Sequence, residues 1–153
     1  MELDGRDQKL LMLLQEDCRI PNAELAGKVG MSASACWRRV RTLEENGVIE
    51  RFGAILDPEK SGLHFRAIVL VQLVRHDPEL QDEFIRAVQS KKEIMECYAT
   101  TGQADYHLRV LCSDLADFNR FLDDFLFRLK AVQSAQTHLV LKELKRGRRL
   151  LLQ

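Results

Sequence analysis

The sequence has no excess of charge of either sign, no long apolar run and no paired cysteines. Lysine plus arginine equals aspartate plus glutamate at 23 each, so any affinity for nucleic acid or a membrane surface must be local. No apolar stretch approaches the roughly 20 residues of a membrane span. The opening residues, MELDGRDQ, carry three acidic side chains, unlike a signal peptide. We therefore expect a cytoplasmic protein with no membrane partner.

Patterns for metal binding and catalysis are also missing. The histidines are scattered without metal-ligand spacing, and the cysteines form no CxxC pair. The cysteines lie within apolar patterns, which favours buried, reduced thiols over disulfides. No P-loop, other glycine-rich phosphate loop or nucleophile elbow is present. The sequence predicts neither an enzyme nor a bound cofactor. The residues concerned are His64, His76, His107, His138, Cys18, Cys36, Cys97 and Cys112.

One of the three prolines, Pro58, marks a boundary in the chain. Proline disfavours helix for the residue before it, and the surrounding DPEKSG stretch is typical of a linker. Hydrophobic periodicity is helical before this stretch, whereas strands and helices alternate after it. We expect two domains, residues 1–57 and 64–153, joined by a linker at 58–63.

The first domain has the pattern of three helices. Asp4 can cap a helix that carries an apolar leucine stripe. A second, short helix spans 22–29 and ends at Gly30, and a third begins at Ser32 after a tight turn. A short helix, a glycine turn and a longer helix are typical of a helix-turn-helix motif.

The third helix, within SASACWRRVRTLEENGVI, has two different faces. Cys36, Val40 and Leu43 share one stripe, which predicts burial. The outward stripe offers guanidinium groups for guanine edges and phosphates, and hydroxyls near the helix N-terminus. The expected DNA contacts are Ser32, Ser34, Trp37, Arg38, Arg39 and Arg41. A solvated face with a half-buried tryptophan is the alternative, but the preceding tight turn favours DNA. The basic tail, 142–149, either ends in solvent or touches DNA.

The second domain has the pattern of an α+β sandwich. The first strand, 64–74, is apolar over its whole length, which suits burial on both faces. Two helices cover only one face of a four-stranded sheet, so a second copy of the chain is expected on the other. The predicted order is the ferredoxin-like βαββαβ. The later elements are a helix from Asp77-Pro78, strands at 94–101 and 105–112, a helix at 115–129 and a strand at 136–144.

The stretch MSASACWRRVRTLEENGVIERFGAILDPEKSGL resembles the DNA-binding half of the Lrp/AsnC, or feast/famine, transcription regulators. The resemblance extends over the second domain. It implies a winged-helix-like DNA-binding domain with a strand leading to Asp57-Pro58, and a ferredoxin-like RAM domain. It also implies a double-stranded DNA operator, association with the nucleoid, and homodimers that assemble into octamers. Family members often carry prolines where this chain has Ala33 and Ala35, and a smaller residue at Trp37.

The resemblance further implies a small amino-acid effector at the loop within ECYATTGQADYHLRV. Backbone amides around Gly102 suit a carboxylate, and Asp105 suits an ammonium group. The resemblance points to eight effector-binding residues: Tyr98, Thr100, Thr101, Gly102, Gln103, Asp105, Thr137 and Leu139. The alternative is an ordinary hairpin with glycine at its turn and Asp105 capping it.

Together these features predict a sequence-specific transcriptional regulator controlled by an amino acid. Two alternatives stay open. The ferredoxin-like half also resembles small oxygenases and dye-decolorising enzymes, although the chain lacks a convincing haem ligand or a paired acid and base. The other is a nucleoid-type architectural binder without ligand control, which would have a small ratio of specific to non-specific DNA affinity.

Overall fold

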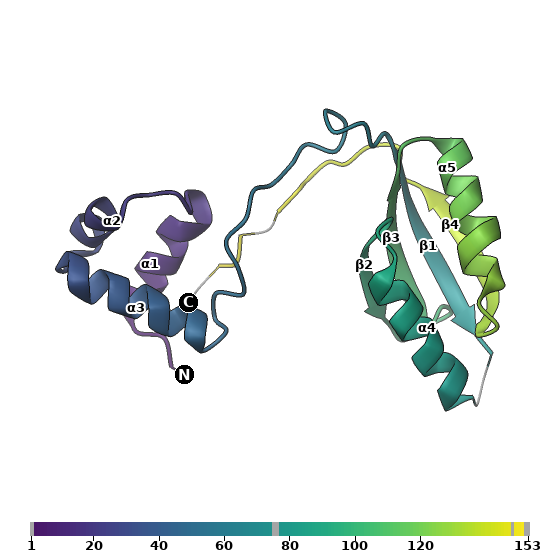
Figure 1. The fold of residues 1–153 in the computed structure, drawn as a ribbon, viewed down its shortest axis with the longest axis horizontal. Coiled ribbons are helices and arrows are strands. Elements are labelled where there is room, and N and C mark those ends of the chain that lie inside the picture. Colours follow the sequence, from purple (N-terminus) through teal and green to yellow (C-terminus); the bar gives the residue numbers. More distant parts are fainter. Residues whose placement is uncertain (1, 75–76, 148, 152–153) are drawn as a thin grey trace. The chain divides into compact units, whose positions relative to one another are not determined.

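The computed structural model describes residues 2–74, 77–147 and 149–151, which form two compact units (Figure 1). The first unit comprises residues up to Ile55 together with the C-terminal segment from Lys145, and the second comprises Leu56–Leu144. The sequence pattern predicts that the tail belongs to the second domain, 64–153. In the structure, the backbone after Leu144 joins the first unit instead.

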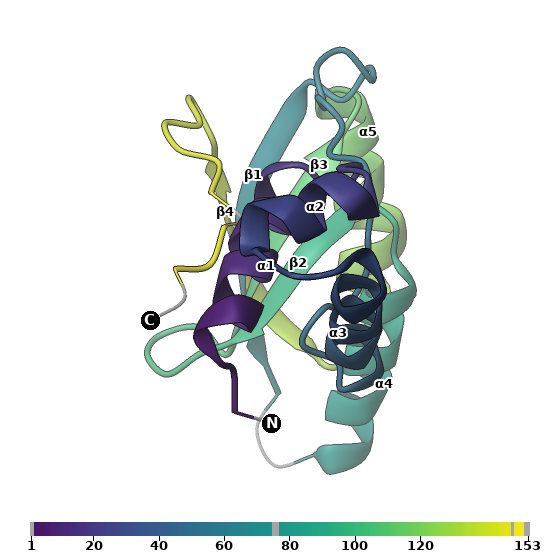
Figure 2. The same cartoon turned by 90° about the vertical axis from the view of Figure 1, so that its left-hand side faces the viewer.

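Three short helices build the first unit: α1 (Gly5–Glu16), α2 (Asn22–Val29) and α3 (Ala33–Glu45) (Figure 2). Asp4 caps α1 as predicted, because its carboxylate accepts hydrogen bonds from the amides of Arg6 and Asp7. The Asp7 carboxylate accepts in return from the Asp4 amide. This reciprocal arrangement is a capping box, which satisfies backbone donors that the first helical turn leaves free.

The core of the first unit is small. Its buried residues come from all three helices: Leu10, Leu25, Ala26, Val29 and Cys36. Val40 packs against this cluster from α3, and Leu43 is fully buried, so the predicted inward stripe of α3 is confirmed. A core of this size leaves part of the helix arrangement to polar contacts.

The C-terminal tail lies against the end of α1. The Leu150 amide donates to the Gln15 side chain at 2.6 Å, and that side chain donates back to the Leu150 carbonyl at 3.2 Å. Arg149 forms an ion pair with Glu16 at 3.4 Å. Arg148 lies outside the described residues. The tail therefore contacts α1, while its side chains stay largely exposed to solvent, as Leu150 at 72% shows.

Residues 46–64 contain turns but no strand, so the strand expected before Asp57-Pro58 is absent. A strand needs a hydrogen-bonded neighbour, and the single chain offers none to this segment. Ile55 and Leu56 are 68% and 70% exposed there.

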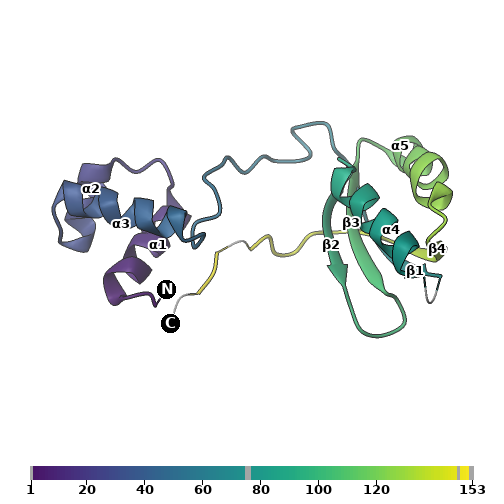
Figure 3. The same cartoon turned by 60° about the horizontal axis from the view of Figure 1, so that its bottom comes forward.

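The second unit is a four-stranded antiparallel sheet in the order β2-β3-β1-β4, with helices along one face (Figure 3). The order strand, helix, strand, strand, helix, strand agrees with the predicted ferredoxin-like sandwich. The last helix, α5, continues into a π-helical turn (Phe121–Phe125) and a 3-10 turn (Leu126–Arg128). The main elements are β1 (Phe65–Leu73), α4 (Pro78–Ser90), β2 (Ile94–Ala99), β3 (Tyr106–Cys112), α5 (Leu115–Arg120) and β4 (Val132–Leu139).

The expectation of a first strand buried on both faces is wrong for the single chain. Ala67, Val69 and Val71 are fully buried beneath the helices, whereas Ile68 is 40% exposed and Leu70 is half-buried. Burial alternates along β1 because both helices lie on the same side of the sheet. The other face is left uncovered, with apolar side chains at its centre.

The last strand was predicted too late in the sequence, at 136–144. β4 runs from Val132, opposite Leu73, to Leu139, opposite Ala67. Its pairing with β1 sets these bounds, although its sequence VQSAQTHL is mostly polar. The residues after β4 are more apolar, and for this reason the strand was predicted to include them. Leu141 and Leu144 are nevertheless 90% and 85% exposed.

The predicted burial of all four cysteines is half right. Cys36 and Cys112 are buried, whereas Cys18 and Cys97 are exposed, and all four are free thiols. Burial, with a contribution from the Asp117 carboxylate, raises the pKa of Cys112 to about 11. Cys18 follows α1 in a turn and Cys97 lies on the edge strand β2, where few neighbours cover a side chain.

Candidate DNA-binding helix and effector site

The turn between α2 and α3 is fixed by local contacts. Gly30 has a φ of 71°, in the left-handed region that glycine adopts readily, and ends α2. The Met31 amide donates to the Ala26 carbonyl at 3.0 Å. The Asn22 side chain donates to the Ala33 carbonyl at 2.8 Å, joining the start of α2 to the first turn of α3. α3 is thereby held at a defined angle to α2.

The outward face of α3 presents four of the six residues expected to contact DNA. Ser34, Trp37, Arg38 and Arg41 are all exposed, Trp37 to 56%. Within the described parts of the chain, the Arg38 guanidinium has no hydrogen-bond or ion-pair partner. Arg38 is therefore available to a phosphate or a guanine edge without breaking an existing contact.

Arg41 is held in place along the helix. Its Nε atom lies 2.7 Å from a carboxylate oxygen of Glu45, and its guanidinium carbon lies 5.3 Å from the centre of the Trp37 ring. A guanidinium over an indole face gains a cation–π attraction. The pair with Glu45 is exposed and hence weak. Arg41 is oriented by its neighbours but can exchange Glu45 for another anion.

Ser32 is the N-cap of α3. Its hydroxyl oxygen accepts from the Ala35 amide at 3.3 Å and lies 3.2 Å from the hydroxyl oxygen of Ser34. The Ser34 side chain has no backbone bond among the described residues. Of the two serines, Ser32 has the structural role, and Ser34 is the freer hydroxyl.

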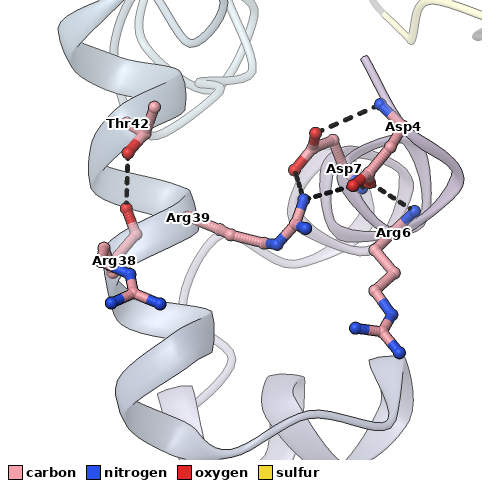
Figure 4. A network of polar contacts seen from close by, with 6 residues as sticks. All are labelled: Asp4, Arg6, Asp7, Arg38, Arg39 and Thr42. Atoms are coloured by element: carbon pink, nitrogen blue, oxygen red, sulfur yellow. Dashed lines mark hydrogen bonds and ion pairs between the residues drawn. The ribbon is translucent and has the colours of Figure 1, made fainter.

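Arg39 points toward α1 (Figure 4). Its Nη1 atom lies 2.7 Å from a carboxylate oxygen of Asp4 and 2.7 Å from one of Asp7. The hydrogen bonds that Arg39 donates to Asp7 and to Asp4 raise the pKa of its guanidinium. The pKa of the Asp4 carboxyl group is lowered mainly by the hydrogen bond from the Asp7 amide and next by the one from the Arg39 side chain. Unlike Arg38 and Arg41, Arg39 therefore contacts α1 of its own domain rather than pointing outward.

The loop between β2 and β3 closes tightly on itself. The Thr100 amide donates to the Asp105 carbonyl at 2.9 Å, and the Thr100 hydroxyl to the Ala104 carbonyl at 3.2 Å. Gly102, at the tip, has a φ of 124°, which other residues rarely adopt. Among the described residues, the amides of Thr101, Gly102 and Gln103 have no acceptor. Three backbone donors at the tip are therefore free for a ligand carboxylate.

Asp105 joins this loop to β1. Its amide donates to the Val71 carbonyl at 2.9 Å, and its carboxylate accepts from the Leu73 amide at 2.8 Å. The residue also lines two neighbouring hollows, of about 450 and 570 Å³. The first is lined by Leu73, Val74, Asp77, Pro78, Gln81, Ala99, Thr100, Asp105 and Tyr106, and the second by Gln72, Leu73, Val74, Gly102, Gln103, Asp105 and Gln133.

The eight predicted effector residues fall into two groups. Thr100, Gly102, Gln103 and Asp105 line the hollows, whereas Thr101, Tyr98, Thr137 and Leu139 do not. Tyr98 stands on the uncovered face of the sheet, where it donates to Glu96 at 3.2 Å, a bond that raises the pKa of its phenol. Thr137 and Leu139 lie on β4, at the opposite edge of the sheet.

Several residues around the hollows were missed from the sequence. The Gln72 side chain donates to the Gln103 carbonyl and accepts from the Ser134 hydroxyl, linking β1, the loop and β4. No local pattern identifies Gln72, because its position depends on the pairing of three strands. Asp77 also lines the first hollow. In the sequence it was recognised only as the residue that starts a helix, and it is the N-cap of α4.

Both halves of the chain match known protein families. Residues 3–50 match the family described as winged helix-turn-helix DNA-binding, and residues 66–150 match the Lrp/AsnC ligand binding domain. The leucine-responsive regulatory protein of Haemophilus influenzae is 38% identical over 98% of this chain and 90% of that protein. The chain belongs to the Lrp/AsnC family. The Escherichia coli leucine-responsive regulatory protein is 36% identical over 99% of this chain and 92% of that protein.

Solved structures of Lrp/AsnC regulators share the fold. A transcriptional regulator of Neisseria meningitidis in complex with L-Met has a TM-score of 0.93 and 35% identity, covering 98% of this chain and 97% of that one. An AsnC family regulator of Agrobacterium tumefaciens has a TM-score of 0.91 and 33% identity, covering 97% of each chain.

The family match assigns a function to each unit of the chain. As a member of the Lrp/AsnC transcriptional regulators, the protein has a helix-turn-helix DNA-binding domain, which contains α1–α3, and a ligand-binding domain, which begins at β1. Across the described parts of the chain, no helix is both long and apolar enough to cross a membrane.

Proposed function

We propose that this protein recognises a double-stranded DNA operator through α3 and regulates transcription in response to a small amino acid bound in its second unit. The observation that carries the DNA half is Arg38, whose guanidinium has no partner among the described residues and which lies on a helix whose opposite face is buried. Guanidinium groups at such a position suit guanine edges in the major groove. Arg41, Trp37, Ser34 and the capping Ser32 complete the proposed contact surface.

The effector half of the proposal depends on a carboxylate and backbone N–H donors that belong to the same loop, next to the hollows that Asp105, Gly102 and Gln103 line. The Asp105 carboxylate suits an ammonium group, and the free amides of Gly102 and its neighbours suit a carboxylate. A free amino acid carries both groups. Two relatives are named leucine-responsive regulatory proteins and one solved relative is an L-Met complex, which supports an amino acid as the ligand class.

Assembly is the third part of the proposal. The uncovered sheet face around Ile68 and Leu70 suits a homodimer, and the dimers would combine into an octamer. In such an assembly Tyr98, Thr137 and Leu139 would complete an effector site together with residues of another copy. The protein would act in the cytoplasm, in association with the nucleoid, without catalytic activity or a cofactor.

Operator recognition is tested by selecting duplexes from a random-sequence pool with the full-length protein. The wild type should enrich one sequence, and Arg38→Ala should bind the enriched duplex about 5- to 150-fold more weakly while folding normally, as for a base contact worth about 1–3 kcal/mol. A protein that enriches no sequence would be an architectural binder instead. Unchanged binding by both Arg38→Ala and Arg41→Ala would refute the assignment of α3.

Effector binding is tested by a thermal-shift screen of the twenty amino acids, with leucine and methionine first. A ligand that binds only the folded protein stabilises it by about 2.7 kcal/mol at 100 times its dissociation constant. The absence of any shift at millimolar concentrations would contradict the amino-acid proposal.

A further inference from the structure

Arg39 is the one arginine of α3 that is directed at another helix of its own unit. It lies one position before Val40 and three after Cys36, the residues that pack α3 into the small core. Its Nη1 atom donates to both Asp4 and Asp7, which are 35 and 32 residues away along the chain. These carboxylates form the capping box at the start of α1. The side chain thus joins α3 to the first turn of α1.

The contact differs from an ordinary surface ion pair. The Asp7 side chain is only 7% exposed and Arg39 is 34% exposed. Both carboxylates are already oriented by bonds to backbone amides, so Arg39 meets a prearranged pair of acceptors. Because the two acceptors are already oriented, only the Arg39 side chain has to be ordered to form the contact. A large rotation of α3 about its axis would move Arg39 out of reach of both carboxylates.

We propose that Arg39 is a positioning residue, which fixes the rotation of α3 through Asp4 and Asp7 so that Arg38 and Arg41 face DNA. The proposal rests on DNA recognition by α3. It gives two acidic residues of α1 a positive role in binding a polyanion, although neither touches it. Only specific binding requires side chains to meet base edges, so only specific binding should depend on this contact.

Simple electrostatics predicts the opposite sign. Replacing an aspartate by asparagine removes a negative charge, which should strengthen DNA binding, and releases Arg39 for a phosphate. A positioning contact predicts weaker specific binding from the same change. Asp4→Asn suits this test because asparagine is a good helix N-cap and Asp4 is half exposed, so the variant should fold. Asp7→Asn and Arg39→Gln break the same contact from its other members.

The experiment uses full-length protein, the duplex enriched by the wild type, and a scrambled duplex of equal length. Affinity is measured over a range of salt concentrations for each variant, after folding has been checked by circular dichroism. We expect Asp4→Asn and Arg39→Gln to lose on the order of tenfold for the enriched duplex, with the scrambled duplex within about twofold of wild type and the salt dependence unchanged. The double variant should lose little more than either single one, because both changes break one contact.

The matched control is Glu24→Gln, which removes one exposed carboxylate from an ion pair with Lys28 in the same unit. It should not weaken binding to the enriched duplex. A gain in affinity by Asp4→Asn would overturn the proposal, and so would unchanged specific affinity in all the folded variants. If the slope of log affinity against log salt concentration is smaller by about one for Arg39→Gln than for the wild type, Arg39 contacts a phosphate instead. Failure of the proposed function itself would appear separately, as an absence of any enriched duplex or an Arg38→Ala variant that binds normally.

Discussion

The Asp105 carboxylate is bonded to the last residue of β1, with 2.8 Å between one of its oxygens and the amide nitrogen of Leu73. The bond ties the β2–β3 loop to the neighbouring strand, and the same residue lines both hollows of the second unit. The sequence presented a turn-capping role and a ligand-binding role for Asp105 as alternatives. The two roles are compatible, because one carboxylate oxygen can accept from the Leu73 amide while the other binds a ligand.

The two roles are separable by substitution. Asparagine retains an acceptor for the Leu73 amide but loses the charge, so Asp105→Asn should keep most of the thermal stability. Its affinity for the amino acid found by the thermal-shift screen should fall by roughly 10- to 150-fold, the loss expected for a charge-assisted bond of about 1.5–3 kcal/mol. Asp105→Ala should lose the same affinity and also about 1 kcal/mol of stability. Calorimetric titration and thermal unfolding measure these quantities, and equal ligand affinity in Asp105→Asn would place the effector elsewhere.

If Arg41 contacts DNA as proposed, Glu45 should compete with DNA for it. Because the exposed pair at 2.7 Å contributes little to stability, Glu45→Gln should unfold at nearly the wild-type temperature. The variant should bind the enriched duplex a few-fold more tightly, since Arg41 no longer exchanges one anion for another. Glu24→Gln again serves as the charge control, and fluorescence anisotropy with labelled duplex is the measurement. Weaker binding by Glu45→Gln would show that Glu45 orients Arg41 for DNA.

The elements that the sequence predicted well have strong local signals. Asp4, Gly30 and Ser32 mark helix ends by side-chain and backbone chemistry that acts within a few residues. The strand β1 was found because its apolar residues are contiguous. β4 was misplaced because its bounds come from pairing with β1, whose partner residues lie 59 (Leu73 to Val132) to 72 (Ala67 to Leu139) positions earlier in the chain.

The candidate sites follow the same division. The inward and outward stripes of α3 were readable from helical periodicity, including the burial of Cys36. The bond from Arg39 to Asp7 spans 32 residues and leaves no local pattern. The hollows beside Asp105 form where β1, the β2–β3 loop and α4 meet, so Gln72 and Asp77 could not be found before the topology was known.

The lowered pKa of Asp4 predicts a pH dependence of stability in the first unit. A carboxyl group with a depressed pKa stabilises the folded state above its ordinary value of 3.8, and this contribution is lost as the pH falls through the folded value. The stability difference between wild type and Asp4→Asn should therefore be constant above about pH 5 and shrink below pH 3.8. Urea unfolding followed by fluorescence of Trp37 measures the first unit, since this is the chain's one tryptophan. A difference that stays constant down to pH 2.5 would refute the role of this carboxylate.

The uncovered face of the sheet gives the last prediction, which concerns Ile68. Its register neighbours are Arg109 on β3 and His138 on β4, so a lysine at this position adds positive charge beside basic groups. Within one chain Ile68 is 40% exposed, and Ile68→Lys should leave the fold of the second unit intact. In a dimer built on this face the change enters the interface twice by symmetry, and each buried charge disfavours association.

The wild type should therefore sediment as a dimer or a larger assembly at micromolar concentration, and Ile68→Lys should shift toward monomer. Met12→Lys is the control, because Met12 is a similarly exposed apolar residue on α1, in the other unit. Its assembly should match that of the wild type. A monomeric wild type, or an Ile68→Lys variant that assembles normally, would contradict dimerisation through the sheet. The effector site proposed to draw on Tyr98, Thr137 and Leu139 would then have to form within one chain, where none of these three residues lines the hollows beside Asp105.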